Sequence, residues 1–356
     1  MTKHNFSAGP AILPKSVLDQ ASEAARDYNG ISLSLLELSH RGPEFTEILN
    51  RAVAKTHELT GLGDEYAVLF LTGGASSQFF MVPMNLLPQE GSADYLNTGR
   101  WSDNAIDEAK SFGTVNTIAS SKEDNYMFIP KDYQSNSNAT YLHYTSNNTV
   151  AGTQFQSLPK SEAPLVCDMS SDIFSKPLDF KRFGLIYAGA QKNLGPAGTT
   201  LVVVRKDLLG KVSREIPTML DYQTHVKKNS SYNTPPVFPI YVCLLTMEWI
   251  LGQGGLAEME RRNKAKSQLL YSEIDRNPLF YGLVNKEDRS MMNATFQLHD
   301  QSQMEELMAM TKEAGCVGLK GHRSVGGLRA SMYNALDLSS VEVLVDIMQE
   351  FERKKG

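Results

Sequence analysis

Residues 66–87 read Tyr-Ala-Val-Leu-Phe-Leu-Thr-Gly-Gly-Ala-Ser-Ser-Gln-Phe-Phe-Met-Val-Pro-Met-Asn-Leu-Leu, which is an apolar run, a glycine-containing turn and a second apolar run. The first run, residues 66–71, has the length and composition of a buried strand, and the second, residues 78–87, is typical of an apolar helix. A strand, a glycine-rich turn and a helix form the βα unit of an α/β sheet. This segment therefore predicts an α/β protein.

Similar apolar runs recur along the chain. They lie at residues 92–96, 139–144, 164–167, 185–188 and 200–205, separated by polar or helical segments. Nearly continuous apolar strands are typical of a mostly parallel central sheet that helices cover on both faces. We expect helices at 15–28, 43–59, 241–251 and 256–277, a long proline-rich loop at 227–239, and neither helix nor strand before Lys15.

The pattern changes after the long helix. An edge strand at 290–299, a helix at 301–314, a strand at 328–333 and a helix at 338–353 describe a small α+β domain. We place the boundary near residue 260. The predicted domains are a large ligand-binding domain at 15–260 and a small C-terminal domain at 261–356, with residues 1–14 packing nearby.

Composition limits the classes of function. The chain has 356 residues and a net charge of −5, so nothing global indicates nucleic acid or an anionic membrane as a partner. Three scattered cysteines lack the spacing of a zinc site or a disulfide framework, and we expect no metal and a reducing, cytoplasmic location. We see neither a signal peptide nor a run of roughly 20 apolar residues that could span a bilayer.

Lys192 is the strongest candidate for chemistry. It lies in Leu185-Ile-Tyr-Ala-Gly-Ala-Gln-Lys-Asn-Leu-Gly-Pro-Ala-Gly198, a strand that runs into a turn of small residues. An ordinary solvated lysine is the alternative. Small neighbours leave room for a bulky ligand close to the backbone, and surroundings that lower the pKa of the amine would make it a nucleophile. Lys192 is therefore predicted to hold pyridoxal phosphate as a Schiff base.

Asp168 and the turn after the first strand complete a candidate cofactor site. Asp168 ends the apolar run at 164–167, where it is either a helix N-cap or a partner that keeps a pyridine nitrogen protonated. Ala75 and Ser76 lie in the glycine-containing turn, where backbone amides at a helix start bind phosphate. Trp101 could stack on the cofactor ring, and a packed core position is an equal alternative.

These pieces, taken in order, resemble the fold-type I pyridoxal-phosphate enzymes, and more narrowly the phosphoserine aminotransferases of class V. The resemblance covers essentially the whole chain. It is carried by the segments at 5–14, 37–41, 143–149, 167–172, 190–198, 231–236 and 321–331. The last, Gly-His-Arg-Ser-Val-Gly-Gly-Leu-Arg-Ala-Ser, is the most specific because it bears on the substrate. The resemblance implies a large domain with a mostly parallel sheet and a small C-terminal domain.

The resemblance also implies roles for individual residues in cofactor binding. Lys192 would carry the cofactor and move a proton, Asp168 would pair with the ring nitrogen, and Trp101 would stack on the ring. The remaining cofactor contacts would come from Ala75, Ser76, Thr149 and Gln191, and from Asn233 and Thr234 across the interface of a homodimer. Ser76 stands where some members have arginine, so here the phosphate would depend more on amide and hydroxyl donors.

The substrates implied are phosphoserine, glutamate, 2-oxoglutarate and 3-phosphohydroxypyruvate. Arginine suits both ends of such dianions because it forms bidentate, charge-assisted hydrogen bonds. Arg329 would bind the α-carboxylate. His322 and Arg323, with His40 and Arg41 of the partner subunit, would bind the phosphate or γ-carboxylate. The reaction would proceed by a ping-pong route, in serine biosynthesis and also in the 4-phosphohydroxy-L-threonine step of pyridoxine biosynthesis.

Three alternatives stay open. An alanine–glyoxylate type of aminotransferase has less need of the two His-Arg pairs. A cysteine desulfurase would need a mobile nucleophilic cysteine, for which Cys316 is the one loop candidate. A non-catalytic phosphate-binding protein on the same scaffold would need neither Lys192 nor Asp168.

Overall fold

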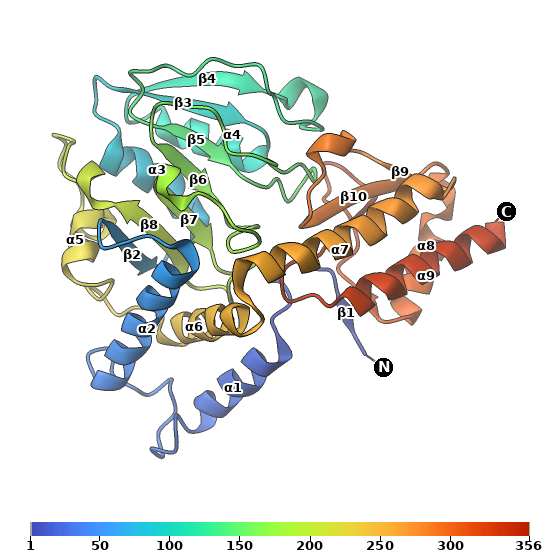
Figure 1. Cartoon of the computed structure of the whole chain (residues 1–356), viewed down its shortest axis with the longest axis horizontal. Coiled ribbons are helices and arrows are strands. Elements are labelled where there is room, and N and C mark those ends of the chain that lie inside the picture. The colour runs from blue at the N-terminus through green and yellow to red at the C-terminus, as the bar shows by residue number, and fades with distance from the viewer. Residues whose placement is uncertain (1, 356) are drawn as a thin grey trace.

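The computed structural model describes residues 2–355, so Met1 and Gly356, at the ends of the predicted domains, lie outside the described residues. A seven-stranded sheet occupies the centre of the larger part (Figure 1), in the order β2-β8-β7-β6-β5-β3-β4. Only β8 runs in the opposite direction to the other strands of this sheet. The predicted α/β fold with a mostly parallel central sheet is therefore confirmed. The strands are β2 (Tyr66–Leu71), β3 (Ser92–Asn97), β4 (Thr114–Ser120), β5 (Leu142–Thr145), β6 (Leu165–Asp168), β7 (Phe183–Gly189) and β8 (Thr200–Arg205).

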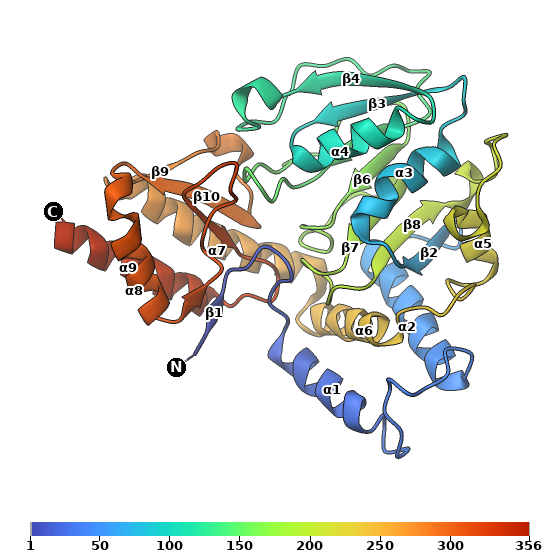
Figure 2. The same cartoon turned by 180° about the vertical axis from the view of Figure 1, so that it is seen from behind.

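Helices cover both faces of this sheet, which explains why its strands are apolar at successive positions. Successive side chains of a strand point to opposite faces. Val68 and Phe70 accordingly pack in one core with α1 (Lys15–Arg26), α2 (Pro43–Thr60) and α6 (Val237–Gly252). Leu69 and Leu71 pack in a second core with α3 (Gly74–Leu86), α4 (Arg100–Ala109) and α5 (Tyr222–Lys227). Figure 2 shows α3 and α4 in front of the sheet.

The smaller part is built on a three-stranded antiparallel sheet in the order β12-β10-β9. It contains β9 (Phe280–Gly282), β10 (Asn293–Leu298), β12 (Leu328–Ser331), α8 (Met304–Glu313) and α9 (Leu338–Lys355). The long helix α7 (Gly255–Arg276) runs from the large part into the small part (Figure 1). Met259 packs in the large core and Leu270 in the small core. The change from one core to the other therefore falls within α7, and the boundary near residue 260 stays a prediction.

Several local predictions were wrong. Residues 4–5 form β1 (His4–Asn5), which pairs with β11 (Cys316–Val317), although no strand was expected before Lys15. The strand predicted at 290–299 is β10, and it lies in the centre of its sheet rather than at an edge. The loop at 227–239 is shorter because α5 ends at Lys227 and α6 begins at Val237. Neither β4 nor α4 was predicted.

Taken singly, none of the helices within residues 2–355 combines the length and the apolar composition needed to cross a bilayer, and α6 and α7 reach them only together, as a pair bent by 84°. No group of three or more His, Cys, Asp or Glu side chains in this part of the chain is arranged to hold a metal ion.

The central sheet predicts a large stability loss on truncation of Phe183. Its side chain is fully buried and stacks near Tyr144 and Phe180. Replacing a buried phenylalanine by alanine costs about 3–5 kcal/mol through lost burial and a residual cavity. Chemical denaturation of Phe183→Ala should show this loss, whereas Lys110→Ala, on the exposed surface, should change the unfolding free energy by less than about 0.5 kcal/mol. Equal effects of the two substitutions would contradict the packing described.

Candidate active site

Lys192 lies in the turn after β7, at the edge of the sheet where the parallel strands end. Its Nζ donates a hydrogen bond of 2.9 Å to the Oγ1 of Thr149. The same nitrogen lies 5.6 Å from the centre of the Trp101 ring. Three residues that were predicted to share a site, from three separate segments, therefore meet.

The topology explains this convergence. Asp168 is the last residue of β6 and pairs with Tyr187 of β7 and Thr145 of β5 in parallel registers. The carboxyl ends of β5, β6 and β7 therefore lie side by side. Asp168 is at one of these ends, and the loops after β5 and β7 carry Thr149 and Lys192. Open α/β sheets bind ligands at this edge.

Burial shifts the pKa values of Lys192 and Asp168, and the charge of each residue opposes the shift of the other. Desolvation lowers the pKa of Lys192, the Asp168 carboxylate opposes this shift, and the Arg329 guanidinium adds to it. Desolvation raises the pKa of Asp168, which Lys192 and hydrogen bonds from Ser170 oppose. The result is an amine that releases its proton more readily than an ordinary lysine, beside a buried carboxyl group.

Ser170 was not anticipated as a site residue. Its backbone N–H donates to Oδ1 of Asp168 at 2.9 Å, and its hydroxyl oxygen accepts from the N–H of Gly189 at 3.0 Å. Ser170 therefore links the aspartate to the turn that carries Lys192. Its position two residues after the aspartate, in Cys167-Asp-Met-Ser-Ser171, was the available signal.

The start of α3 has the geometry of an anion-binding site. Gly73 and Gly74 have φ of 97° and 69°, and the helix begins at Gly74, so Ala75 and Ser76 lie in its first turn. Amide N–H groups in a first turn lack helical partners and bind anions. A Cβ on Gly189 would lie 3.0 Å from Oε1 of Gln191 and 3.5 Å from the amide nitrogen of Ala75. The missing side chain therefore lets Gln191 approach this helix start.

Arg329 extends from β12 of the small part to the same loop. Its NH1 donates a hydrogen bond of 3.0 Å to the backbone carbonyl of Thr149. Its Nε is buried and has no hydrogen-bond partner among the described residues. Thr149 thus accepts a hydrogen bond from Lys192 at its hydroxyl oxygen and one from Arg329 at its carbonyl oxygen.

Arg329 and two further arginines lie close enough to His322 to affect its pKa. Desolvation lowers the pKa of His322, and the positive charges of Arg329, Arg100 and Arg323 lower it further. Within residues 2–355, none of these three arginines takes part in an ion pair. Arg100 was missed at the sequence level, although it directly precedes Trp101. The cluster is an unpaired cationic site.

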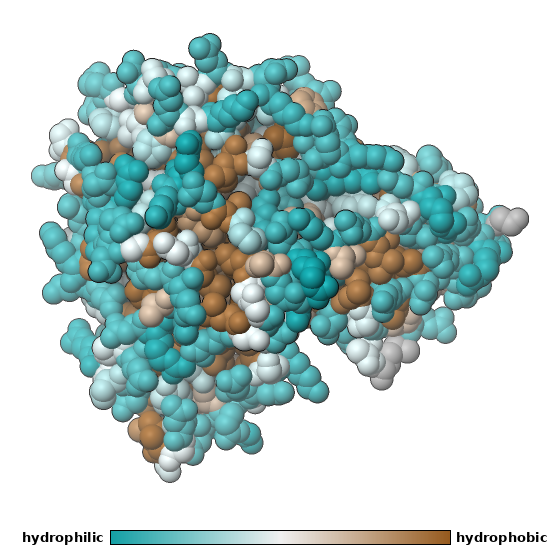
Figure 3. Space-filling model, in the orientation of Figure 1, coloured by the Kyte–Doolittle hydropathy of each residue, from teal (hydrophilic) through white to brown (hydrophobic). Residues whose placement is uncertain are grey.

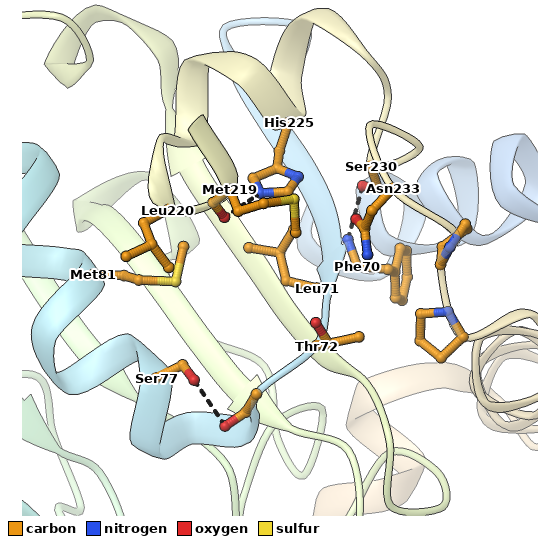
Figure 4. A pocket seen from close by; sticks show the side chains of 13 residues that line it. Phe70, Leu71, Thr72, Ser77, Met81, Met219, Leu220, His225, Ser230 and Asn233 are labelled. Carbon is orange, nitrogen blue, oxygen red and sulfur yellow. Dashed lines mark hydrogen bonds between the residues drawn. The ribbon is translucent and has the colours of Figure 1, made fainter. Parts of the chain in front are cut away.

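Two predicted pairs of site residues, His40 with Arg41 and Asn233 with Thr234, do not join this cluster within one chain. Across the described residues, no hydrogen bond or ion pair links His40 or Arg41 to Lys192, Asp168 or Arg329. Thr234 is exposed. Asn233 lines a cavity of about 130 Å³ beside Gly73 and the buried His225 (Figure 4).

Cys316 does not have the environment of a reactive thiol. It is buried in β11, and burial raises its pKa to about 11. A thiolate is the nucleophilic form of cysteine, so this setting argues against a desulfurase.

Comparisons with known proteins agree with this geometry. Residues 3–344 match the family model of class-V aminotransferases. Over 355 residues the chain is 58% identical to the phosphoserine aminotransferase of Flavobacterium psychrophilum, an alignment that covers 99% of this chain and 100% of that protein. The phosphoserine aminotransferase structure from Bacillus circulans subsp. alkalophilus superposes with a TM-score of 0.96 at 47% identity, covering 100% of this chain and 99% of that one. The structure of the PLP-bound phosphoserine aminotransferase from Trichomonas vaginalis superposes with a TM-score of 0.93 at 37% identity, covering 98% of this chain and 100% of that one.

Because Asp168 opposes the lowering of the Lys192 pKa by burial, the substitution Asp168→Asn should change that pKa in a known direction. Removing the carboxylate removes the attraction that keeps the amine protonated, so the pKa of Lys192 should fall further and its neutral fraction near pH 7 should rise. The pH profile of reductive methylation in the apoprotein, followed at the Lys192 peptide by mass spectrometry, measures this. Lys110 in the same sample is the control, and its profile should not change. A profile for Lys192 that stays fixed or moves to higher pH would contradict the assignment.

Proposed function

The chain belongs to the class-V aminotransferases, within the branch of the phosphoserine aminotransferases, and from this membership we propose its reaction. It transfers an amino group between L-glutamate and 3-phosphohydroxypyruvate, which yields 2-oxoglutarate and L-phosphoserine. Both amino acids carry an α-carboxylate and a distal anionic group. The site must therefore bind two anionic groups on each substrate.

The unpaired cations beside Lys192 carry this proposal. Arg329 is partly buried, its Nε lacks a partner in the described chain, and desolvation lowers its pKa. A buried charge without a counter-ion is costly, and a bound carboxylate would remove the cost through charge-assisted hydrogen bonds. We assign the α-carboxylate to Arg329, and the distal phosphate or carboxylate to His322 and Arg323. Arg100 would add to the positive potential that attracts these dianions.

The residues present fit pyridoxal phosphate. The free amides in the first turn of α3 suit the phosphate, with Ala75 and Ser76 as the binding residues and Thr149 and Gln191 beside them. The Trp101 ring lies beside Lys192, and its buried Nε1 has no partner among the described residues. Asp168 provides a buried carboxyl group for the ring nitrogen.

When bound, the cofactor supplies an electron sink for the negative charge that develops at the substrate Cα. Lys192 would bind the aldehyde carbon of the cofactor with loss of water. Once the substrate amine displaces it from that carbon, the free amine of Lys192 would take the proton that leaves Cα and deliver it to the former aldehyde carbon. The lowered pKa of Lys192 suits this task because a neutral amine accepts a proton. Asp168 would hold a proton on the ring nitrogen, and Trp101 would orient the ring and exclude water from one face.

We further propose a homodimer in which each site takes residues from both subunits. The segment between α1 and α2 carries His40 and Arg41 together with the exposed Ile31, Leu33 and Leu36, the last 66% exposed. Figure 3 shows apolar surface at the tip formed by this segment and over the centre of the same face. A partner subunit on this face would bury that surface, and would supply His40 and Arg41 to the distal anion site and Asn233 and Thr234 to the cofactor phosphate.

Arg329, His322 and Arg323 would also bind 4-phosphohydroxy-L-threonine, because this compound has the same α-carboxylate and phosphate groups as phosphoserine. The two half-reactions would follow one another by a ping-pong route, because one amine and one set of cations serve both substrates.

The half-reaction with L-phosphoserine tests the proposed substrate. Mixing yellow holoprotein with L-phosphoserine or L-glutamate should abolish the visible absorbance, with dissociation constants at least about tenfold lower than for L-alanine, which lacks the distal anion. Stopped-flow absorbance measures all three. Bleaching by alanine with equal affinity would instead favour the alanine–glyoxylate type of enzyme, and a protein that takes up no cofactor would exclude both.

Mixed dimers test the shared site. If Arg41 acts across the interface, a dimer of one Lys192→Ala subunit and one Arg41→Ala subunit retains one intact site. Random exchange of equal amounts should therefore restore roughly a quarter of the wild-type activity, although each parent is nearly inactive with phosphoserine. Mixing Lys192→Ala with Lys192→Ala,Arg41→Ala is the matched control, which has no intact site. No recovery in the first mixture would show that Arg41 does not act in trans.

A further inference from the structure

The loop that carries Thr149 is fastened to the small part of the molecule by a buried network of polar side chains. This loop spans residues 146–154, between β5 and β6. Nδ2 of Asn147 donates to Oδ1 of Asn293, in β10, at 2.7 Å and to Oγ of Ser171 at 2.8 Å. Oδ1 of Asn147 accepts a hydrogen bond from the hydroxyl of Ser290. Asn147 and Asn293 are both almost fully buried, although they lie 146 residues apart.

Asn293 continues the network to the substrate-binding strand. Its Nδ2 donates to Oγ of Ser331 at 2.9 Å and to the hydroxyl of Tyr333 at 3.3 Å. Ser331 lies in β12, two residues beyond Arg329, and pairs with Asn293 in the antiparallel register. The position of Arg329 is therefore tied to Asn147 through a single side chain.

Backbone contacts make the attachment tight. The hydroxyl of Thr295 donates to the carbonyl of Ala151, and the N–H of Ser290 donates to the carbonyl of Gly152. Gly152 has a φ of 93°, and a Cβ there would lie only 2.8 Å from the carbonyl oxygen of Asn293. The loop thus contacts β10 too closely for any side chain at this position.

Asn148 fastens the same loop on its other side. Its Nδ2 donates to the carbonyl of Thr98 at 2.8 Å, and a Cβ on Gly99 would lie 2.6 Å from that nitrogen. Thr98 and Gly99 directly precede the helix that carries Trp101. Two successive asparagines therefore hold Thr149 between the segment of Trp101 and the sheet of Arg329.

We propose that Asn147 and Asn293 are positioning residues, which hold Thr149, Lys192 and Arg329 in register across the two parts of the molecule. Neither touches the reacting atoms. They act by fixing the threonine that accepts hydrogen bonds from both cations. Truncating one asparagine leaves the other buried without its partner, so the loop and the strand should separate. The assignment rests on the proposed function only where it concerns substrate affinity.

Asn293→Ala in the holoprotein tests the proposal with two readouts. The pH at which the visible band changes should shift, because the surroundings of Lys192 change. The dissociation constants for phosphoserine, glutamate and alanine should all rise by a similar factor of about ten, because Arg329 serves the α-carboxylate that all three share. Should Asn293→Ala fail to fold, Asn147→Ser, which keeps one hydrogen-bond donor, carries the same test.

Phe351→Leu is the matched control for stability alone. Phe351 is fully buried in the core of the small part, away from the network. The control should lower the melting temperature while leaving the visible pH titration and the dissociation constants unchanged. If the asparagine variants behave like this control, the two residues are merely structural and the proposal is wrong. The visible pH titration needs only the bound cofactor and no substrate. If the proposed substrate is wrong, this would appear separately, because phosphoserine would not bleach the wild-type protein.

Discussion

Two positively charged side chains share one threonine, and the rest of the site depends on that arrangement. Lys192 donates to the hydroxyl of Thr149 and Arg329 to its carbonyl, so both charges lie in a partly desolvated space beside one carboxylate, Asp168. Like charges held this close repel one another, and burial removes the water that would screen them. The chain tolerates this repulsion because Lys192 can give up its proton. Arg329 cannot, so it needs an external anion.

The fold explains how this expensive arrangement is held. Asp168 ends one strand of a rigid sheet and Lys192 follows the adjacent strand, and the residues of both strands are buried. Arg329 comes from a different sheet with its own core. Repulsion would push such parts apart unless other contacts opposed it. The buried hydrogen bonds between the loop at 146–154 and β10 supply that opposition with groups that carry no charge of their own.

Sequence patterns predicted the parts of this molecule that local composition determines. The strand at 66–71 was predicted with its observed ends, because burial on both faces makes every residue apolar. The strand at 114–120 was missed because it lies at the sheet edge and carries polar residues among its apolar ones, so no continuous apolar run marks it. The segment at 290–299 was assigned to an edge because only one of its two neighbours, β12, was predicted as a strand, whereas β9, which has only three residues, was missed. Lys192 and Asp168 could be picked out because each follows an apolar run.

The pairing of Asn147 with Asn293 illustrates what no local pattern contains. Each asparagine, considered alone, resembles a turn residue, and nothing near it in the chain reveals that it is buried. Only the folded arrangement of two sheets turns them into one network. The same holds for His40 and Arg41, whose predicted place in the site cannot be read from a single chain, because one chain does not bring them to Lys192. In the homodimer proposed above, the site would be complete only when a second subunit joins, and the same unpaired charges would link substrate binding to assembly.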